Sequence, residues 1–271
     1  MRVRDKVFVV TGAGSGIGRA VVFDLLARGA RVAAVDRRPE GLAETMTLAQ
    51  AGRGRLTTYV LDITDRAAVE ALPAQVVEDY GQVDGLLCIA GIIQRFVYLD
   101  EMTMEEIERV MAVNFWGTLY LDLAFLPLLK QRPEACIVNV SSEGALVPVP
   151  GQSIYGASKG AVKLLTEGLY AELRDTKVAV TVVFPGGANT GITVNSGVEA
   201  PKIPADKMPK VLTPEEAARP IVDAIEKGTF RVVIGRDAHM LDGLSRIAPR
   251  RAIEIAADRM KSYLGSSSRT A

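Results

Sequence analysis

A tyrosine and a lysine four residues apart, Tyr155 and Lys159, are the side chains of this sequence best suited to acid–base chemistry. On a helix this spacing places both side chains on one face, one turn apart. A free phenol has a pKa of about 10 and exchanges protons poorly at neutral pH. A nearby ammonium favours the phenolate, so the pair could act as a general acid/base near physiological pH. The same spacing also occurs on ordinary solvated helix faces, so the rest of the chain must show whether this pair is an acid/base site or an exposed helix surface.

Composition excludes several functional classes. The 271 residues include 32 basic and 32 acidic side chains, so no global charge favours nucleic acid or an anionic membrane. His239 is the one histidine, which argues against a metal site or a Ser-His-Asp triad. Cys88 and Cys136 form no Cys-x-x-Cys pair, and we expect no disulfide bond. An apolar strand begins at Val7 without a signal peptide, and no apolar run approaches about 18 residues. We therefore expect a cytoplasmic protein without a membrane span.

Short apolar runs alternate with amphipathic segments along most of the chain. This alternation predicts βαβ units and a Rossmann-like, doubly wound parallel sheet of about seven strands with helices on both faces. We expect a catalytic domain over residues 1–236 and a C-terminal helical extension of the same domain over 237–271. The predicted strands are 7–10, 31–35, 56–61, 84–89, 136–140, 178–184 and 230–234. The predicted helices are 17–28, 40–51, 66–80, 103–131, 154–174, one from 214, and one or two within 237–264.

A glycine-rich turn, Thr11 to Gly18, joins the first strand to the first helix and includes Ser15 and Ile17. The strict Gly-x-Gly-x-x-Gly pattern is not met; the glycines that fit are Gly12, Gly16 and Gly18. A strand, a glycine turn and a helix N-terminus together present backbone amides and a positive helix end to a phosphate. This stretch therefore predicts a dinucleotide site.

The acid that ends the second strand, Asp36, lies where a carboxylate would reach the adenosine ribose hydroxyls. It would also repel a 2′-phosphate, so NAD is favoured over NADP. Arg37 and Arg38 follow directly and could in principle bind that phosphate, or lie in a solvated turn. Asp62, followed by Ile63, could meet the adenine amino group or cap the next helix.

In the order and spacing of these residues, the chain resembles the short-chain dehydrogenase/reductase family from residue 6 to about 235. The resemblance implies that Tyr155 is the proton donor in ketone reduction and the acceptor in alcohol oxidation. It implies that Lys159 holds the nicotinamide ribose and lowers the tyrosine pKa, and that Ser142 hydrogen-bonds the substrate oxygen. Asn114 would belong to a proton relay through water to Lys159.

The resemblance also implies a full cofactor site. Thr190 would meet the nicotinamide amide, Asp36 the ribose and Asp62 the adenine. The cofactor-binding residues are then expected to be Gly12, Ser15, Gly16, Ile17, Gly18, Asp36, Arg37, Asp62, Ile63, Ala90, Gly91, Tyr155, Lys159, Pro185, Gly186 and Thr190. One departure is Cys88-Ile89, where the family commonly has Asn-Asn, and this puts local stability and cofactor fit in doubt.

The substrate end is less defined by the sequence. Residues 187–212 break the strand–helix rhythm and are expected to form a substrate lid. Glu143 could face the pocket and select an amine or a polyol, or be a solvated loop residue; Gln94 and Gln152 are weaker candidates of the same sort. The C-terminal segment leaves an amphipathic trace, expected to pack on its own domain or a neighbouring subunit, with a membrane-surface helix as the alternative.

The leading hypothesis is an oxidoreductase that transfers hydride between NAD(H) and a small secondary alcohol or ketone. The alternatives are a cofactor-binding sensor or scaffold without turnover, and a lyase or isomerase that holds its cofactor tightly. The family resemblance also suggests a homodimer or homotetramer built partly on the helices containing residues 112–131 and 154–174.

Overall fold

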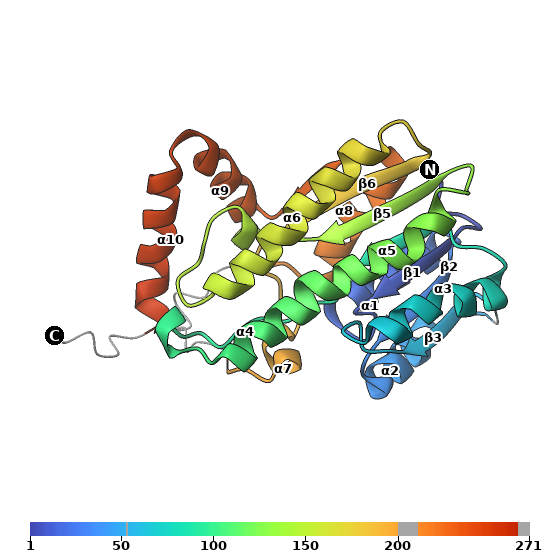
Figure 1. Cartoon of the computed structure of the whole chain (residues 1–271), viewed down its shortest axis with the longest axis horizontal. Helices are drawn as coiled ribbons and strands as arrows, with labels where there is room; N and C mark the ends of the chain where they lie inside the picture. The colour runs from blue at the N-terminus through green and yellow to red at the C-terminus, as the bar shows by residue number, and fades with distance from the viewer. Residues whose placement is uncertain (53, 200–210, 265–271) are drawn as a thin grey trace.

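Seven parallel strands form one sheet in the order β3-β2-β1-β4-β5-β6-β7 (Figure 1). The structure is a computed structural model that describes all residues except 53, 200–210 and 265–271. The strands are β1 Val7–Thr11, β2 Arg31–Asp36, β3 Leu56–Val60, β4 Gly85–Cys88, β5 Ala135–Val140, β6 Val178–Pro185 and β7 Arg231–Ile234. The predicted fold class is confirmed, and the strand order changes direction between β1 and β4, where α/β sheets open their ligand crevice.

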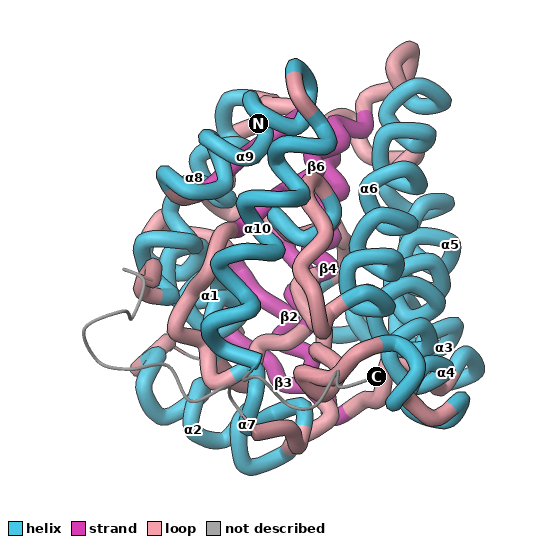
Figure 2. The backbone as a smooth tube through the Cα atoms, turned by 90° about the vertical axis from the view of Figure 1, so that its left-hand side faces the viewer, coloured by secondary structure: helices cyan, strands magenta, loops and turns pink. Residues whose placement is uncertain are grey.

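Helices cover both faces of the sheet, which explains why β1, β4 and β5 are buried along their whole length. One face packs against α1 Gly16–Ala27, α2 Pro39–Ala49 and α8 Pro214–Lys227. The other face packs against α3 Arg66–Tyr80, α5 Gly117–Leu129 and α6 Ser153–Leu173. Figure 2 shows α5 and α6 side by side on the outside of this second layer.

The predicted helix over 103–131 divides into three parts. It comprises α4 Met104–Met111, a π-helical turn over Ala112–Trp116, and α5. Asn114 lies within the π turn and is fully buried. Such turns insert one extra residue into a helix and often occur at functional sites, and this one was not foreseen from the periodicity.

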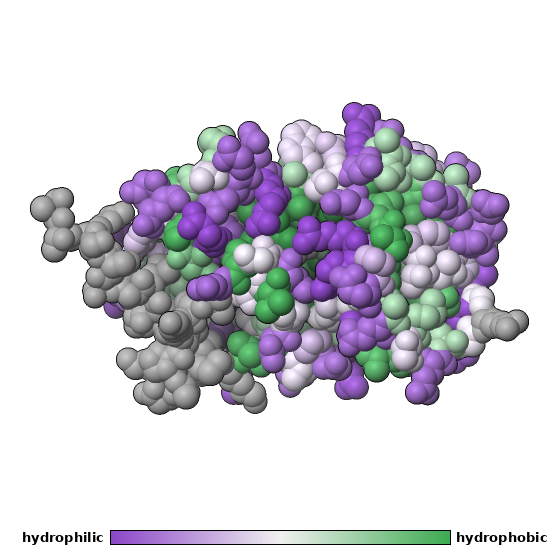
Figure 3. Space-filling view, turned by 90° about the horizontal axis from the view of Figure 1, so that it is seen from below, coloured by the Kyte–Doolittle hydropathy of each residue, from purple (hydrophilic) through white to green (hydrophobic). Residues whose placement is uncertain are grey.

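The helical stretch Met104–Leu129 is long and apolar enough, by length and composition alone, to cross a membrane. The sequence expectation concerned continuous apolar runs, and Asn114 and Asp122 interrupt the apolar run within this helix. Its Leu121, Phe125 and Leu129 are nevertheless fully buried in the core between the sheet and α3. These contacts are those of a core helix. On the face drawn in Figure 3, hydrophilic and hydrophobic residues are interspersed.

The segment after β6 contains one short helix, α7 Ile192–Ser196, and its two ends are hydrogen-bonded to each other through Gly187, Asn189 and Leu212. The central part of the expected lid, 200–210, lies outside the described residues. The C-terminal segment forms two helices, α9 Arg236–Ile247 and α10 Pro249–Leu264, at one end of the molecule (Figure 1). Leu241, Ala252 and Ala256 pack with Val147, so this segment contacts its own domain, as the first alternative expected.

Cys88 and Cys136 are both free and buried, so the expectation of no disulfide bond between them is confirmed. Two short 3₁₀ turns, Leu99–Glu101 and Glu143–Ala145, complete the described helical elements.

A buried polar cluster joins α5, β5 and α6. Asn139 Nδ2 donates to Asp122 Oδ2 at 2.9 Å and to Thr166 Oγ1 at 3.1 Å. Asp122 Oδ1 and Asn139 Oδ1 have no hydrogen-bond partner among the described residues. Burial raises the pKa of Asp122 to about 7, and the hydrogen bond from Asn139 lowers it. The folded protein therefore favours the protonated carboxyl, and ionising it is costly.

We expect Asp122→Asn to stabilise the protein at pH 8. The pKa of Asp122 is about 7 in the folded protein and about 3.9 in the unfolded chain. The contribution of this carboxyl to the free energy of unfolding is therefore fully present below about pH 4 and is lost as the pH rises through 7. The amide removes the buried charge and supplies an N–H, which should add about 1–3 kcal/mol to the free energy of unfolding at pH 8. Urea unfolding at pH 5 and pH 8 measures this. Asp100→Asn, the same change on an exposed residue, is the control and should change little. Equal pH dependence in wild type and Asp122→Asn would contradict the interpretation.

Candidate active site

A cavity of about 390 Å³ lies at the carboxyl edge of the sheet, where β1, β2, β4, β5 and β6 end. Every catalytic or cofactor-binding residue expected from the sequence lines it except Asn114, and Ser142, Tyr155 and Lys159 are among them. The remaining expected residues on the wall are Gly12, Ser15, Gly16, Ile17, Gly18, Asp36, Arg37, Asp62, Ile63, Ala90, Gly91, Pro185, Gly186 and Thr190. Residues as far apart in the sequence as Gly12 and Asn195 meet here because all parallel strands end at one edge.

The glycine turn is packed too closely for side chains. A Cβ on Gly18 would lie 2.1 Å from the carbonyl oxygen of Gly12. Gly16 has a φ of +51°, and its Cβ would lie 2.9 Å from Thr190 Cβ. The turn therefore forms a backbone cradle at the start of α1, and this cradle fits a pyrophosphate.

Asp36 is bound to the same turn. Its Oδ2 accepts from the backbone N–H of Gly14 at 2.9 Å, and its Oδ1 accepts from that of Arg38 at 3.0 Å. The carboxylate is thus fixed at the cavity wall by backbone donors. Each oxygen keeps a further lone pair, which fits the acceptance of ribose hydroxyls.

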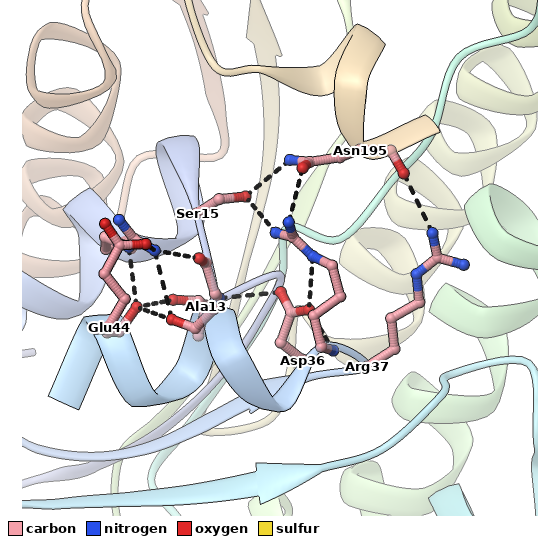
Figure 4. A network of polar contacts seen from close by, with 11 residues as sticks. Ala13, Ser15, Asp36, Arg37, Glu44 and Asn195 are labelled. Carbon is pink, nitrogen blue, oxygen red and sulfur yellow. Dashed lines mark hydrogen bonds and ion pairs between the residues drawn. The ribbon is translucent and has the colours of Figure 1, made fainter. Parts of the chain in front are cut away.

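Two arginines and an asparagine of α7 form the network drawn in Figure 4. Arg38 donates to Asn195 Oδ1 at 2.8 Å and to Ser15 Oγ at 3.0 Å, and Asn195 Nδ2 donates to the same hydroxyl at 2.9 Å. Arg37 donates to the Asn195 carbonyl at 3.1 Å. This network connects α7 to the glycine turn. Asn195 was not expected from the sequence, because its segment shows no periodicity or motif.

The loop that begins at Cys88-Ile89, where the family commonly has Asn-Asn, is held by the Thr11 side chain of β1. The hydroxyl of Thr11 accepts from the N–H groups of Ile89 at 3.0 Å and Ala90 at 3.2 Å. Cys88 is buried, and burial raises its thiol pKa. The loop that carries Ala90 and Gly91 is thereby tied to β1.

Tyr155 lies at the start of α6 with Ser142 and Glu143 beside it. Burial raises the pKa of Tyr155, a hydrogen bond with the Ser142 side chain lowers it, and the negative charge of Glu143 raises it. The net direction is upward, so the downward shift expected from Lys159 is not seen. Ser142 Oγ accepts from the N–H of Gly144 at 3.1 Å, which leaves its own hydrogen free to donate.

Lys159 is 4% exposed, and its ammonium donates to the Val140 carbonyl at 2.9 Å. Burial lowers its pKa to about 8, against a smaller upward effect of Cys88. Ser141 Oγ donates to the Lys159 carbonyl at 2.8 Å, so the end of β5 holds this turn of α6 at two points. A Cβ on Gly91 would lie 3.1 Å from Lys159 Nζ, so the glycine leaves the cavity open beside the ammonium.

Asn114 lies behind the cavity wall. Its Oδ1 accepts from the N–H of Ile92 at 2.9 Å, and its Nδ2 donates to the Ile92 carbonyl and to Ser158 Oγ, each at 2.9 Å. A Cβ on Gly91 would lie 3.2 Å from Asn114 Oδ1, on the same side as Lys159 Nζ. Asn114 therefore connects the π turn, the loop after β4 and α6.

The three candidates for substrate contact differ in position. Glu143 and Gln152 line the cavity, whereas Gln94 is absent from its described lining and accepts from a backbone amide at the start of α6 instead. Apolar walls come from residues that carried no motif, namely Ile92, Ile93, Phe96, Val113, Val149 and Ile192. Among the described residues, no three His, Cys, Asp or Glu side chains come together to hold a metal ion.

Comparison with known proteins places this geometry among enzymes. A family model described as short chain dehydrogenase matches residues 6–200. A Mycobacterium tuberculosis protein named "Putative oxidoreductase SadH" is 40% identical over 250 residues, covering 89% of this chain and 90% of that protein. A short chain dehydrogenase/reductase of Burkholderia phymatum, solved in complex with NAD, has a TM-score of 0.83 at 27% identity and covers 96% of this chain and 98% of its own. One from Burkholderia cenocepacia in complex with NADP has a TM-score of 0.78 at 30% identity, covering 94% and 98%.

Proposed function

The chain belongs to the short-chain dehydrogenase/reductase family of oxidoreductases, and we propose that it transfers hydride between NAD(H) and a secondary alcohol or ketone with Tyr155 as general acid/base. The observation that carries this proposal is the meeting of Tyr155, Ser142 and Lys159 in one cavity with the glycine cradle. A sensor or scaffold would not require this acid–base set. A lyase or isomerase would give no net change in cofactor redox state.

In this mechanism the protein moves the proton. Bound nicotinamide would supply or accept the hydride. In ketone reduction, Tyr155 donates its phenolic proton to the carbonyl oxygen while the Ser142 hydroxyl donates a hydrogen bond to the same oxygen. The raised pKa of Tyr155 keeps the phenol protonated at neutral pH. In alcohol oxidation, the phenolate accepts the proton, so that direction should become faster as the pH rises.

The remaining site residues take supporting roles in this proposal. Lys159 would hold the nicotinamide ribose, and its ammonium would favour the phenolate once Tyr155 gives up its proton. Asn114 would keep the loop after β4 against α6 and serve the relay to Lys159, which its position near Lys159 Nζ supports. Residues 187–212 would form the substrate lid, supported by the cavity-lining positions of Ala188, Ile192 and Thr193.

The central test is Tyr155→Phe. This change removes the proton donor and should lower kcat by at least about 100-fold while NADH binding, followed by fluorescence, is retained. Tyr170→Phe, on the same helix and outside the cavity lining, is the matched control. Turnover is followed as NADH oxidation on a panel of ketones and NAD reduction on secondary alcohols. Full activity of Tyr155→Phe on a true substrate would make the mechanism wrong.

Preference for NAD over NADP is supported by the position of Asp36. Its carboxylate would oppose a 2′-phosphate. The nearby Arg38 is engaged by Asp36 at 3.6 Å, by Ser15 and by Asn195, so its guanidinium is already partnered.

Asp36→Ala should therefore reduce the preference for NADH over NADPH by at least about tenfold, through weaker NADH binding and loss of repulsion toward the phosphate. The ratio of the two dissociation constants measures this. Glu40→Ala removes an equal charge from the exposed start of α2 and should leave the ratio unchanged. A wild-type protein that binds NADPH more tightly would overturn the preference.

A homo-oligomer is supported by apolar side chains on the outer faces of adjacent elements. Trp116, Leu123 and Leu164 are 46%, 61% and 66% exposed, on the π turn, α5 and α6. The π turn contacts both α5 and α6, and these two helices lie side by side (Figure 2), so we infer that the three side chains offer a patch for a second copy.

The double change Leu123→Glu with Leu164→Glu should convert the oligomer to a smaller species, because it places charge in a desolvated interface. Sedimentation velocity measures the mass. Leu48→Glu changes a leucine on α2 that is 54% exposed and should leave the mass unchanged. An oligomer that survives the double change would have to use another surface.

A further inference from the structure

Helix α6 begins at Ser153 without a cap from its own sequence. Its N-cap residue, Gln152, makes no side-chain hydrogen bond to the first turn. The first amides of any helix lack intrahelical acceptors, and a short polar side chain at the N-cap usually accepts from them. In α6 these amides belong to the turn that carries Tyr155.

A residue 60 positions earlier supplies the missing acceptor. Gln94 Oε1 accepts from the backbone N–H of Ile154 at 2.8 Å and from that of Tyr155 at 3.0 Å. Both donors are backbone amides, so the side-chain atom between them must be the oxygen. Gln94 is 1% exposed, which excludes water as a competing partner and strengthens both bonds.

Two further hydrogen bonds hold Gln94 itself, one through its backbone carbonyl and one through its side-chain nitrogen. Its carbonyl accepts from Gln152 Nε2 at 3.0 Å, and its own Nε2 lies 3.1 Å from Met102 Sδ. Two residues earlier in the same segment, Ile92 makes two hydrogen bonds with Asn114. Ile93 N–H donates to Ser196 Oγ of α7 at 3.0 Å. The segment is thus rigidly connected to the loop that carries Ala90 and Gly91.

We infer that Gln94 is a positioning residue for the reaction: its side-chain oxygen fixes the backbone of Tyr155 relative to the cofactor-side loop after β4. The inference rests on the proposed role of Tyr155. A proton donor must lie within hydrogen-bond distance of the reacting oxygen, and a displacement of about 1 Å can cost about 100-fold in rate. Lys159 is anchored separately through Val140 and Ser141, so loss of Gln94 would move Tyr155 relative to Lys159.

If Gln94 were only a structural cap, its loss would lower stability without lowering kcat. Thr213 caps α8 in the ordinary way, by accepting from the Glu216 N–H at 3.2 Å, and α8 contributes no residue to the described cavity lining. Thr213→Ala therefore removes a cap from a helix without chemistry. It is the control for loss of stability alone.

The experiment compares three variants of the full chain. Gln94→Met has similar shape and replaces the amide oxygen with a thioether, a much weaker acceptor, so we expect kcat to fall about 10–100-fold. The NADH dissociation constant should stay within about twofold of wild type, because the hydrogen bonds of Asp36 and of the Gln94 side chain involve different segments. Gln94→Glu keeps an acceptor oxygen at the same reach and should recover most of the lost kcat. Thr213→Ala should lower Tm without lowering kcat.

Two results would overturn the inference: an unchanged kcat in Gln94→Met, or a Gln94→Glu variant that folds, binds NADH and is as slow as Gln94→Met. The parallel Tyr155→Phe measurement separates this failure from a failure of the proposed function. If Tyr155→Phe is inactive and Gln94→Met is fully active, only the positioning role is lost. If Tyr155→Phe keeps full turnover, the proposed chemistry fails first.

Discussion

The carboxyl ends of parallel strands meet at one edge of a sheet, and this constraint organises the whole molecule. It brings the ends of β1, β2, β4, β5 and β6 around one cavity, but it also leaves strand ends and helix starts with unpaired backbone groups. Buried polar side chains fill those positions. Thr11 accepts from the loop after β4, and Asn114 pairs with both backbone groups of Ile92. Gln94 accepts from the first turn of α6.

These bonds share one consequence. Each connects segments distant in sequence, and each lies within a few residues of a group expected to take part in the chemistry. Lys159 belongs to the same pattern, because its ammonium is held by the end of β5 rather than by a carboxylate. A buried ammonium that donates to a backbone carbonyl has a lowered pKa, and a partly buried phenol has a raised one. Burial therefore moves the two pKa values apart, and the phenol holds its proton more tightly than the ammonium does.

Burial also explains the polar cluster of Asp122 and Asn139 behind the sheet. Asp122 Oδ1 and Asn139 Oδ1 have no partner among the described residues, and the pKa of Asp122 is raised, because the buried carboxyl binds a proton more tightly than it would in water.

The C-terminal helices contribute differently. They add a small apolar cluster over Val147, which follows the 3₁₀ turn that carries Glu143.

The sequence by itself was enough for the strand–helix alternation, the glycine turn and the candidate residues Ser142, Tyr155 and Lys159 that meet in the cavity, because these depend on local periodicity and on residues at short, regular spacing. Gly12, Gly16, Gly18 and Asp36 could be identified for the same reason: one βαβ unit contains them all. Only the tertiary structure could show the π turn at Asn114, the network of Asn195 with Arg38, and the cap that Gln94 places on α6. Each depends on which distant segments come into contact, and a single side chain such as Gln94 carries no periodic signal of its partner 60 residues away. The direction of the Tyr155 pKa differed from expectation for a related reason, since desolvation is a property of the packed site and not of the Tyr–Lys spacing.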